Sequence, residues 1–401
     1  MQPQSVLITV TGSDRPGVTS ALFAGLAAHD VEVIDVEQVV IRSNLMLSVL
    51  LTLRGEAAPL RRAVARVSDG LGIDMEVAIG EEVDDAGPRR AGHHQVMVLG
   101  NPLRAGAVGE VARRIADLGA NIDSITRLSN YPVTSLELTV SGADSAELRT
   151  TLATAAKETN TDIAVERAGL HRRAKRLLVM DVDSTLVQGE IIEMLAEHAG
   201  CADQVARVTE ATMAGELDFT ESLRARVALL RGLPESVLDE VRAKVQLMPG
   251  ARTLIRTVRR MGFRCGVVSG GFTQFTDDLV RTLGLDFAAA NTLEIVDGRL
   301  TGRLSGEIVD RAGKARALVH FAQRFEVPLS QTVAVGDGAN DIDMLNTAGL
   351  GIAFNAKPAV CDAADASLSQ PYLDAILFLL GISRDEVEQA DADDPMTGSS
   401  L

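Results

Sequence analysis

Residues 177–185 read LLVMDVDST, an apolar run that turns acidic at Asp181. Two later stretches have the same form: residues 263–268 lead into the SGG of 269–271, and residues 332–335 lead into the GDGAND of 336–341. Short apolar runs of this kind, separated by longer stretches with helical spacing, are typical of a parallel sheet covered by helices. We therefore predict an α/β domain with an open parallel sheet over residues 177–384, and residues 351–354 as a fourth strand.

The polar residues that follow these strands should meet, because all strands of a parallel sheet end at the same edge. The carboxylates gathered there would be those of Asp181, Asp183, Asp337 and Asp341. Such a cluster repels itself unless it binds a cation, and a ligand set made only of oxygen favours Mg²⁺. Ser269, the neighbouring glycine amides and Lys314 would add the hydrogen bonds and positive charge that hold a phosphoryl group.

This combination predicts phosphoryl chemistry. A carboxylate beside a metal and a phosphate can attack phosphorus, and a second carboxyl two positions on can protonate the leaving oxygen. Each motif alone also fits a plain structural role: an aspartate after a strand is often a helix cap, Ser-Gly-Gly is often a turn, and a lone lysine is usually solvated. A calcium loop starting at Asp181 is excluded, since Leu186 and Ile192 stand where glycine and a carboxylate are needed. The co-occurrence of all the motifs in one sheet favours catalysis.

Composition excludes several other classes of protein. Of 401 residues, 55 are acidic and 39 basic, a net charge of −16 that argues against a nucleic-acid partner. No apolar run reaches the ~18 residues of a membrane span. The first ten residues lack the features of a secretory signal, and Cys201, Cys265 and Cys361 are too far apart for a disulfide framework or a zinc site. We predict a cytoplasmic protein with reduced cysteines and no membrane or nucleic-acid partner.

The first 168 residues contain one pattern written twice, in the order βαββαβ. The copies are predicted as domains at residues 1–83 and 95–168, joined by the charged linker 84–94. A repeat of about 85 residues is too long for a solenoid unit and suggests paired small ferredoxin-like domains. A second, basic joint at 169–176 could contact nucleic acid or form a solvated hinge, and we favour the hinge.

Two further segments differ from the sheet in pattern. Residues from about 190 to 245 have helical periodicity and little strand signal, which predicts a helical cap inserted after the first strand. Residues 385–401 carry six acids between Asp385 and Asp394 and end in small polar residues, which predicts a disordered tail.

The strand-end motifs, together with Lys314, resemble the four signature motifs of the haloacid-dehalogenase superfamily, whose core is a Rossmann-like hydrolase sheet. Asp183 resembles the acid of the phosphatases, since the ion pumps of that superfamily have no acid at this position. Residues 180–190, 213–219 and 222–227 are similar to the phosphoserine phosphatases in particular.

This resemblance implies a role for each site residue. Asp181 would be the nucleophile and Asp183 the general acid/base. The metal would be held by Asp181, the backbone carbonyl of Asp183 and Asp337, with Asp341 as a direct or indirect ligand. Residues implied for the substrate are Ser269, Gly270, Lys314 and Asn340 at the phosphate, Glu190 at the ammonium, Arg226 at the carboxylate, and Met213 and Phe219 in the lid. Periodicity alone does not separate Glu190 from Glu193, or Arg226 from Arg224.

The two N-terminal copies resemble ACT domains, which bind small amino acids and regulate enzymes of amino-acid metabolism. The first copy has Asp14-Arg15-Pro16-Gly17 before its first helix, whereas the second has Asn101 in place of the acid and keeps a glycine at Gly106. The resemblance implies that Asp14, Gly17, Asn101 and Gly106 contact a regulatory amino acid. The structural alternative is that these residues cap helices and that the domains only dimerise.

The residues by themselves predict phosphoryl chemistry, and the two resemblances imply a Mg²⁺-dependent phosphoserine phosphatase. It would convert O-phospho-L-serine to L-serine and phosphate, the last step of serine biosynthesis, through an aspartyl-phosphate. It would form a homodimer and bind L-serine or another amino acid at its ACT domains. Two alternatives remain: a sister phosphatase or phosphotransferase acting on another small phosphate monoester, and a non-catalytic amino-acid sensor.

Overall fold

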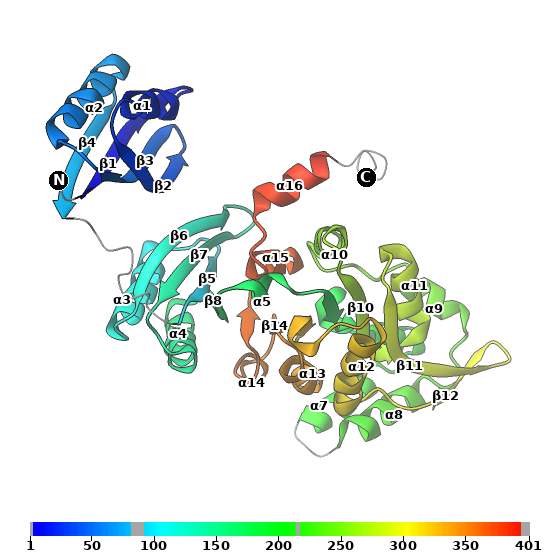
Figure 1. Ribbon diagram of the computed structural model, residues 1–401. Helices are drawn as coiled ribbons and strands as arrows, with labels where there is room; N and C mark the ends of the chain where they lie inside the picture. The colour runs from blue at the N-terminus through cyan, green and yellow to red at the C-terminus, as the bar shows by residue number, and fades with distance from the viewer. Residues whose placement is uncertain (1–2, 82–91, 214–216, 394–401) are drawn as a thin grey trace. The chain divides into compact units, whose positions relative to one another are not determined.

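The structure, a computed structural model, describes residues 3–81, 92–213 and 217–393 (Figure 1). Within these ranges the side chains of residues 81, 170, 171 and 213 are not described. The chain divides into two compact units, Met1–Arg89 and Arg90–Leu401. Each unit is described by itself below.

The first unit is a four-stranded antiparallel sheet with two helices. Its elements are β1 (Gln4–Ser13), α1 (Val18–Leu26), β2 (Val31–Ile41), β3 (Asn44–Leu53), α2 (Ala57–Leu71) and β4 (Asp74–Glu81), and the strand order is β2-β3-β1-β4. Every second residue of β1, namely Val6, Ile8 and Val10, is fully buried in the core that this face of the sheet forms with the helices. The predicted ferredoxin-like fold is confirmed.

The second unit begins with a copy of the same fold. Its elements are β5 (His94–Gly100), α3 (Ala105–Asp117), β6 (Asn121–Ser129), β7 (Thr134–Ser141), α4 (Ser145–Thr159) and β8 (Asp162–Arg167), in the order β6-β7-β5-β8. The equivalent strands pair in the same way in both copies, as the internal repeat predicts. β5 starts at His94, within the range predicted as linker.

A seven-stranded sheet follows, in the order β12-β11-β10-β9-β13-β14-β15. Its strands are β9 (Leu177–Met180), β10 (Arg264–Phe272), β11 (Phe287–Val296), β12 (Arg299–Ser305), β13 (Thr332–Gly336), β14 (Gly351–Phe354) and β15 (Ala366–Leu368). β9 lies at the centre with parallel neighbours on both sides, and among the described strands of this sheet only β11 and β12 pair antiparallel. The sequence indicated β9, β10, β13 and β14 but not the other strands.

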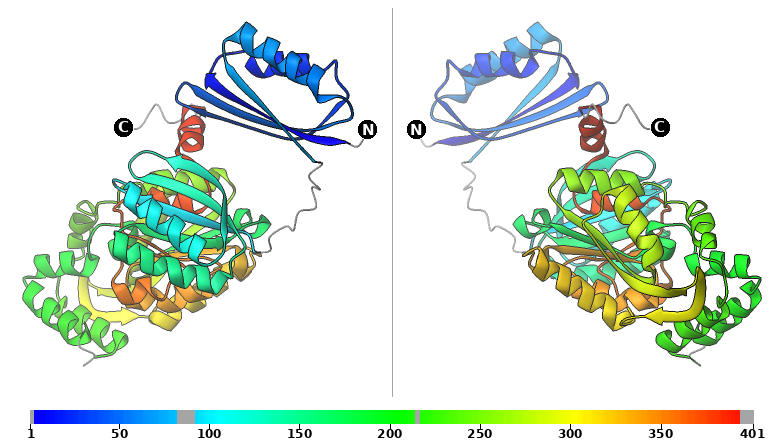
Figure 2. Two further views of the ribbon diagram at one scale, coloured as in Figure 1. Left: turned by 90° about the vertical axis from the view of Figure 1, so that its left-hand side faces the viewer. Right: turned by 90° about the vertical axis from the view of Figure 1, so that its right-hand side faces the viewer.

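Helices cover both faces of this sheet (Figures 1 and 2). Leu178 and Met180 of β9 belong to one hydrophobic cluster, with α10 (Ala251–Arg260) and α11 (Thr273–Leu283). Leu177 and Val179 point the other way, into the cluster formed with α12 (Arg311–Arg324) and α13 (Ile342–Thr347). Because strand side chains alternate between faces, a short, wholly apolar strand is what a sheet covered on both sides requires.

The predicted helical cap is confirmed and consists of α6 (Ile191–Ala199), α7 (Ala202–Met213), α8 (Phe219–Leu229) and α9 (Ser236–Arg242). The chain enters and leaves this cap side by side. The Gln188 N–H donates to the Gln246 carbonyl at 2.8 Å, and the Met248 N–H donates to the Leu186 carbonyl at 2.8 Å. The two segments that connect the cap to the core are therefore hydrogen-bonded to each other.

The prediction that residues 169–176 form a solvated hinge is wrong. Arg172, in α5 (Leu170–Arg173), is 8% exposed and pairs with Glu137 at 2.5 Å and Glu166 at 3.1 Å. Lys175 is 5% exposed and donates to the carbonyls of Ser330 and Gly349. The basic side chains are buried because carboxylates of the second ferredoxin-like fold and carbonyls next to the seven-stranded sheet supply their partners.

The prediction of disorder from Asp385 onward is also wrong for the described part of that segment. Residues Arg384–Ala392 form α16, which starts with a capping box between Ser383 and Glu386. Asp391 pairs with Arg256 and Arg260 of α10, so the acidic charge is matched by basic residues of the core. Residues 394–401 lie outside the described residues.

Two other sequence-based expectations concern the whole chain. Within the described residues, none of the helices has both the length and the apolar character needed to cross a bilayer. Cys201, Cys265 and Cys361 are free, and the first two are buried.

Candidate active site

The site begins where β9 ends. Asp181 is 4% exposed, and its carboxylate accepts a hydrogen bond from the Val182 N–H at 2.7 Å. Asp183 accepts from the N–H of Ile191, the first residue of α6, at 2.8 Å, and from the Ser269 hydroxyl at 3.4 Å. The turn between the sheet and the cap therefore orients both aspartates of the DVD sequence.

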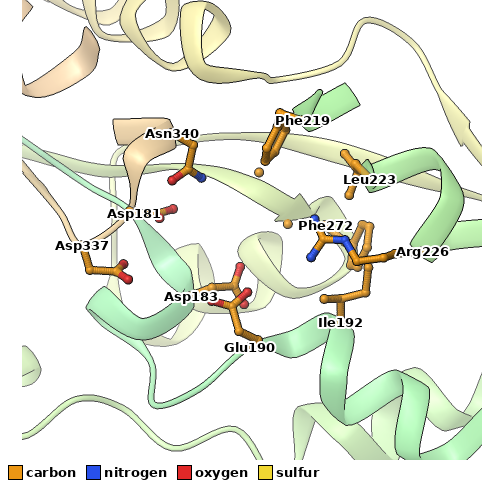
Figure 3. Close-up of a pocket in the computed structure, with 13 residues that line it drawn as sticks. Asp181, Asp183, Glu190, Ile192, Phe219, Leu223, Arg226, Phe272, Asp337 and Asn340 are labelled. Carbon is orange, nitrogen blue, oxygen red and sulfur yellow. The ribbon is translucent and has the colours of Figure 1, made fainter. Parts of the chain in front are cut away.

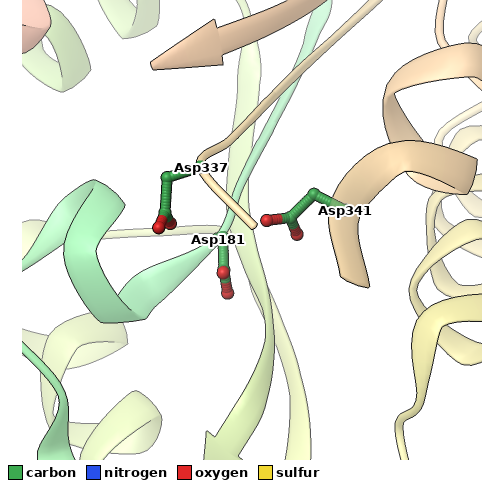
Figure 4. A group of neighbouring side chains, drawn as sticks. All are labelled: Asp181, Asp337 and Asp341. Carbon is green, nitrogen blue, oxygen red and sulfur yellow. The ribbon is translucent and has the colours of Figure 1, made fainter. Parts of the chain in front are cut away.

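Three carboxylates form a group that can hold a metal ion (Figure 4). Oxygen atoms of Asp181, Asp337 and Asp341 all lie within 4.8 Å of one another. The Thr185 hydroxyl donates to Asp337 at 2.9 Å and fixes its orientation. The Asp183 side chain is not a member of this group, because its carboxylate is held by the cap and by the Ser269 turn.

Lys314 lies beneath the carboxylates, on the first turn of α12. Its side chain is 0% exposed, and its Nζ lies 2.8 Å from Asp181 Oδ1 and 2.7 Å from Asp341 Oδ1. Burial by itself would lower the pKa of the lysine, but Asp181 and Asp341 outweigh burial and raise the pKa above its ordinary value. Lys314 is therefore charged. Asp341 also accepts from the Gly338 N–H at 3.0 Å, so both of its oxygens have partners within the protein.

The group contains more carboxylates than the single lysine can pair with, so it could bind a cation. Burial and then the neighbouring carboxylates hold the pKa of Asp181 well above its usual range. The same causes, in the same order, raise the pKa of Asp337 to about 6. One lysine cannot neutralise this group of acids, and a hard divalent cation with oxygen ligands would. These oxygen atoms thus fit a metal ion held by Asp181 and Asp337. Asp341 is close to them, but both of its oxygens already have partners in the protein.

A cleft extends from the carboxylates to the cap (Figure 3). It is lined by Asp181, Asp183, Glu190, Ile192, Phe219, Leu223, Arg226, Gly270, Gly271, Phe272, Asp337, Gly338 and Asn340. Figure 3 shows Asp337 at one end and Arg226 at the other. The cleft is narrow at the glycine turn: a Cβ on Gly270 would lie 2.8 Å from Phe219 Cζ, and one on Gly271 would lie 2.8 Å from Asp183 Oδ2. These two positions need glycine because the cap and the acid approach the backbone so closely.

The cap end of the cleft contains an acid and a base. The pKa of Glu190 is raised to about 7, first by burial and then by Asp183 and Asp337. Ser184, in a left-handed conformation with φ 57°, donates its hydroxyl to Glu190 at 3.3 Å. Within the described part of the chain, Arg226 Nε is buried and has no hydrogen-bond partner. A carboxylate and a guanidinium are thus both available to a ligand.

The structure distinguishes between candidate residues that helical periodicity alone could not tell apart. Glu190 and Arg226 line the cleft, whereas Glu193 and Arg224 are exposed. The predicted phosphate residues Ser269, Gly270, Lys314 and Asn340 are brought together around the carboxylates. Met213 lies outside the described side chains.

Sequence reasoning missed several residues that shape the site, namely Thr185, Ile192, Leu223 and Phe272. A signal existed for Leu223, because Phe219, Leu223 and Arg226 are spaced i, i+4, i+7 and therefore share one face of α8. Phe272 carried no such signal, since it follows the glycines at the end of β10 and has no periodic relation to the other site residues.

The predicted regulatory residues lie in or just after the loop that follows the first strand of each ferredoxin-like fold. Asp14 and Gly17 line a pocket with Gln38, and Gly17 caps α1 with φ 97°. Asn101 lies in the β5–α3 loop and is exposed. Gly106 lies inside the first turn of α3 and does not cap that helix, so the two loops differ in backbone as well as in sequence.

Comparison with known proteins assigns families to all three parts. Residues 178–346 match the haloacid dehalogenase-like hydrolases, and residues 4–78 and 92–166 each match ACT domains. A phosphoserine phosphatase of Streptomyces coelicolor is 59% identical over 97% of this chain and 96% of its own length. The phosphoserine phosphatase SerB2 of Mycobacterium tuberculosis is 60% identical over the same shares of the two chains. The chain belongs to the phosphoserine phosphatase family.

Solved structures agree with this assignment. A probable phosphoserine phosphatase from Vibrio cholerae superposes with a TM-score of 0.57 at 33% identity, covering 74% of this chain and 88% of the other. A haloacid dehalogenase family hydrolase from Salmonella enterica gives a TM-score of 0.64 at 27% identity, covering 72% and 98%. As a member of the phosphoserine phosphatase family, the chain is a phosphatase with a hydrolase core, a helical cap and two N-terminal ACT domains.

Proposed function

We propose that the protein hydrolyses O-phospho-L-serine to L-serine and inorganic phosphate, the last step of serine biosynthesis. The observation that carries the proposal is the placing of Glu190 and Arg226 at the far end of a cleft that starts at Asp181. Phosphoserine has a phosphate at one end and an ammonium and a carboxylate at the other. The cleft offers matching groups in the same arrangement.

The phosphate end supplies the chemistry. We propose that Mg²⁺ is held by Asp181, Asp337 and the Asp183 carbonyl, with Asp341 as a direct or indirect ligand, and that when bound it neutralises charge on the phosphoryl oxygens. Ser269, Gly270, Lys314 and Asn340 hold the remaining oxygens. Phosphoryl transfer depends mainly on such positioning and charge neutralisation.

Two aspartates carry the bond changes. An Asp181 oxygen attacks phosphorus as the bond to the serine oxygen breaks, and Asp183 donates its proton to that leaving oxygen. Asp183 then takes a proton from water, whose oxygen attacks phosphorus and releases Asp181 as a carboxylate. The Ile191 N–H and the Ser269 hydroxyl keep Asp183 aimed into the cleft throughout.

The acid and base at the cap end select the substrate. Glu190 binds the ammonium and Arg226 binds the carboxylate, while Phe219 and Met213 exclude water when the cap closes. Binding of the ammonium would favour the ionised form of Glu190, whose pKa is raised to about 7, first by burial.

The ACT domains would provide regulation. We propose that L-serine or another free amino acid binds at the loops of Asp14 and Gly17 and of Asn101 and Gly106, and that the protein works as a cytoplasmic homodimer. The proposed boundaries are ACT domains at 1–83 and 95–168 and the phosphatase domain at 177–384. The linker predicted at 84–94 ends before His94, where β5 starts, and residues 169–176 form a packed connection.

The deciding experiment is phosphate release from a panel of monoesters in the presence of Mg²⁺. Preference for phosphoserine over phosphothreonine and sugar phosphates supports the proposal. Preference for another ester would instead indicate a sister phosphatase, and absence of release from every ester would indicate a non-catalytic sensor.

A further inference from the structure

Asn291 lies behind the cleft, on β11, and is not among the residues that line it. Its side chain is almost fully buried, with 1% exposed, and both ends of its amide are used. The Nδ2 donates to the Gly270 carbonyl at 2.8 Å, and the Oδ1 accepts from the Val309 N–H at 2.8 Å. One side chain thus bridges two separate segments of the active site.

The first segment is the glycine turn. The peptide between Gly270 and Gly271 is planar, so fixing its carbonyl also fixes the direction of the Gly271 N–H. That N–H donates to the Ser269 hydroxyl at 2.8 Å, and the hydroxyl donates to Asp183 at 3.4 Å. Asn291 is therefore connected to Asp183, the proposed acid/base, through a chain of hydrogen bonds and can influence its orientation.

The second segment leads to the lysine. Val309 directly precedes Asp310, whose carboxylate caps α12 by accepting from the Gly313 N–H at 2.6 Å. Lys314 is in the first turn of the same helix, and its N–H donates to the Asp310 carbonyl at 2.9 Å. A displacement at Val309 would therefore move the base of the helix that places Lys314 against Asp181.

We propose that Asn291 is a positioning residue, which sets the spacing between the Ser269–Gly271 turn and the helix that carries Lys314. Both segments are proposed to hold the phosphoryl group, so this inference rests on the proposed function. It adds a residue outside the signature motifs that acts through other residues and touches no substrate. Shifts of a fraction of an ångström between the two segments would then lower the rate of the chemical step without altering the cap end of the site.

The test compares Asn291→Asp with Thr292→Val in the full-length protein. The aspartate can still accept from the Val309 N–H but cannot donate to the Gly270 carbonyl. Thr292 is on the same strand and its hydroxyl contacts the Thr273 hydroxyl at 3.2 Å, so its replacement removes a neighbouring hydrogen bond away from the glycine turn. Measured quantities are kcat and KM for phosphoserine and p-nitrophenyl phosphate, the inhibition constant of inorganic phosphate, and the melting temperature.

We expect kcat to fall about 10- to 100-fold with both substrates in Asn291→Asp, because misplacement of reacting groups has effects of this size. Inhibition by inorganic phosphate should weaken, while the preference for phosphoserine over p-nitrophenyl phosphate stays near that of the wild type. Thr292→Val should keep kcat within about twofold, whatever its melting temperature.

The inference is overturned if folded Asn291→Asp keeps kcat within twofold, or if its defect is confined to phosphoserine. Where Asn291→Asp does not fold, Asn291→Ser, which is small and uncharged, is measured and judged in the same way. Failure of the proposed function is a separate result, seen as absence of phosphoserine hydrolysis by the wild type. If the wild type prefers another monoester, the comparison is run with that ester.

Discussion

Asp183 accepts a hydrogen bond from the N–H of Ile191 at 2.8 Å, which ties the proposed acid/base to the first residue of the cap. The other Asp183 oxygen accepts from Ser269 in the core. The carboxylate therefore lies at the junction of the two bodies that must close around a substrate. Its proposed role as a proton donor depends on both.

Replacing the nucleophile should stop turnover and leave the fold intact. We expect Asp181→Asn to lower kcat by more than about 1,000-fold, as loss of a catalytic nucleophile does elsewhere. The fold should survive because Lys314 retains Asp341 as a partner. Phosphate release and circular dichroism measure the two effects. The matched control is Asp343→Asn, an aspartate of α13 paired with Arg311 on the surface, which should stay close to wild-type activity. Substantial activity in Asp181→Asn would remove it from the nucleophile role.

Arg226 should discriminate between substrates. We expect Arg226→Ala to raise KM for phosphoserine about 10- to 100-fold, the effect of losing a charge-assisted hydrogen bond. KM for p-nitrophenyl phosphate, which has no carboxylate, should change much less. Arg224→Ala is the control, since that side chain is exposed on the same helix. Equal changes for both esters would place Arg226 outside the substrate site.

The acidic cluster should make stability depend on pH and on metal. Burial first, then neighbouring acids, raises the pKa of Glu190 from 4.5 to about 7 and that of Asp337 from 3.8 to about 6. A carboxyl with a raised pKa in the folded state contributes stability below its unfolded pKa, and loses that contribution as pH rises through the folded value. In a chelating buffer, the free energy of unfolding should therefore fall between pH 4.5 and 7.

Urea unfolding at several pH values measures this slope. Glu190→Gln should flatten it, because the amide has no proton to lose. Mg²⁺ should restore stability most strongly at the upper end of the range, where the carboxylates are ionised. A slope of the opposite sign in the chelated wild type would contradict the electrostatic account of the cluster.

Arg172 should be essential to the packing of the second unit. Removing one partner of a buried ion pair leaves the others without a countercharge, and Arg172→Met should lower the free energy of unfolding by about 3–5 kcal/mol. Arg173→Met, at an exposed position in the same short helix, is the control and should change it by less than about 0.5 kcal/mol. Chemical denaturation measures both. If the two variants are equally stable, the Arg172 ion pairs do not stabilise the unit.

The central architecture could be predicted because its signals are local. The four strands that were identified are short and apolar, and the cap has continuous helical periodicity. β11 was missed since three alanines follow Phe287 and Asn291 interrupts the apolar run, and β12 since it has only two apolar residues and a glycine at its centre. β15 has only three residues. These strands are defined by their neighbours in the sheet, and sequence pattern carries little of that information.

The candidate site also contains residues that the sequence predicted and residues that it did not. Residues to which the motifs give a role were found from the sequence. Thr185, although it lies in the first motif, and Asn291 act through partners far away in the chain. The two failed predictions, a solvated 169–176 and a disordered 385–392, have one cause. Charged segments were treated as solvated, but Arg172 and Asp391 meet opposite charges supplied by distant elements.

The two segments that connect the cap to the core are hydrogen-bonded to each other, Gln188 to Gln246 and Leu186 to Met248. This pairing should affect the rate of turnover. Two segments that are hydrogen-bonded to each other bend less freely than two independent ones. The cap should therefore move as a rigid body about these segments. Serine and phosphate would then both leave only after the cap has opened. Turnover should then slow in viscous solvent, as it does where opening of a cap limits the rate.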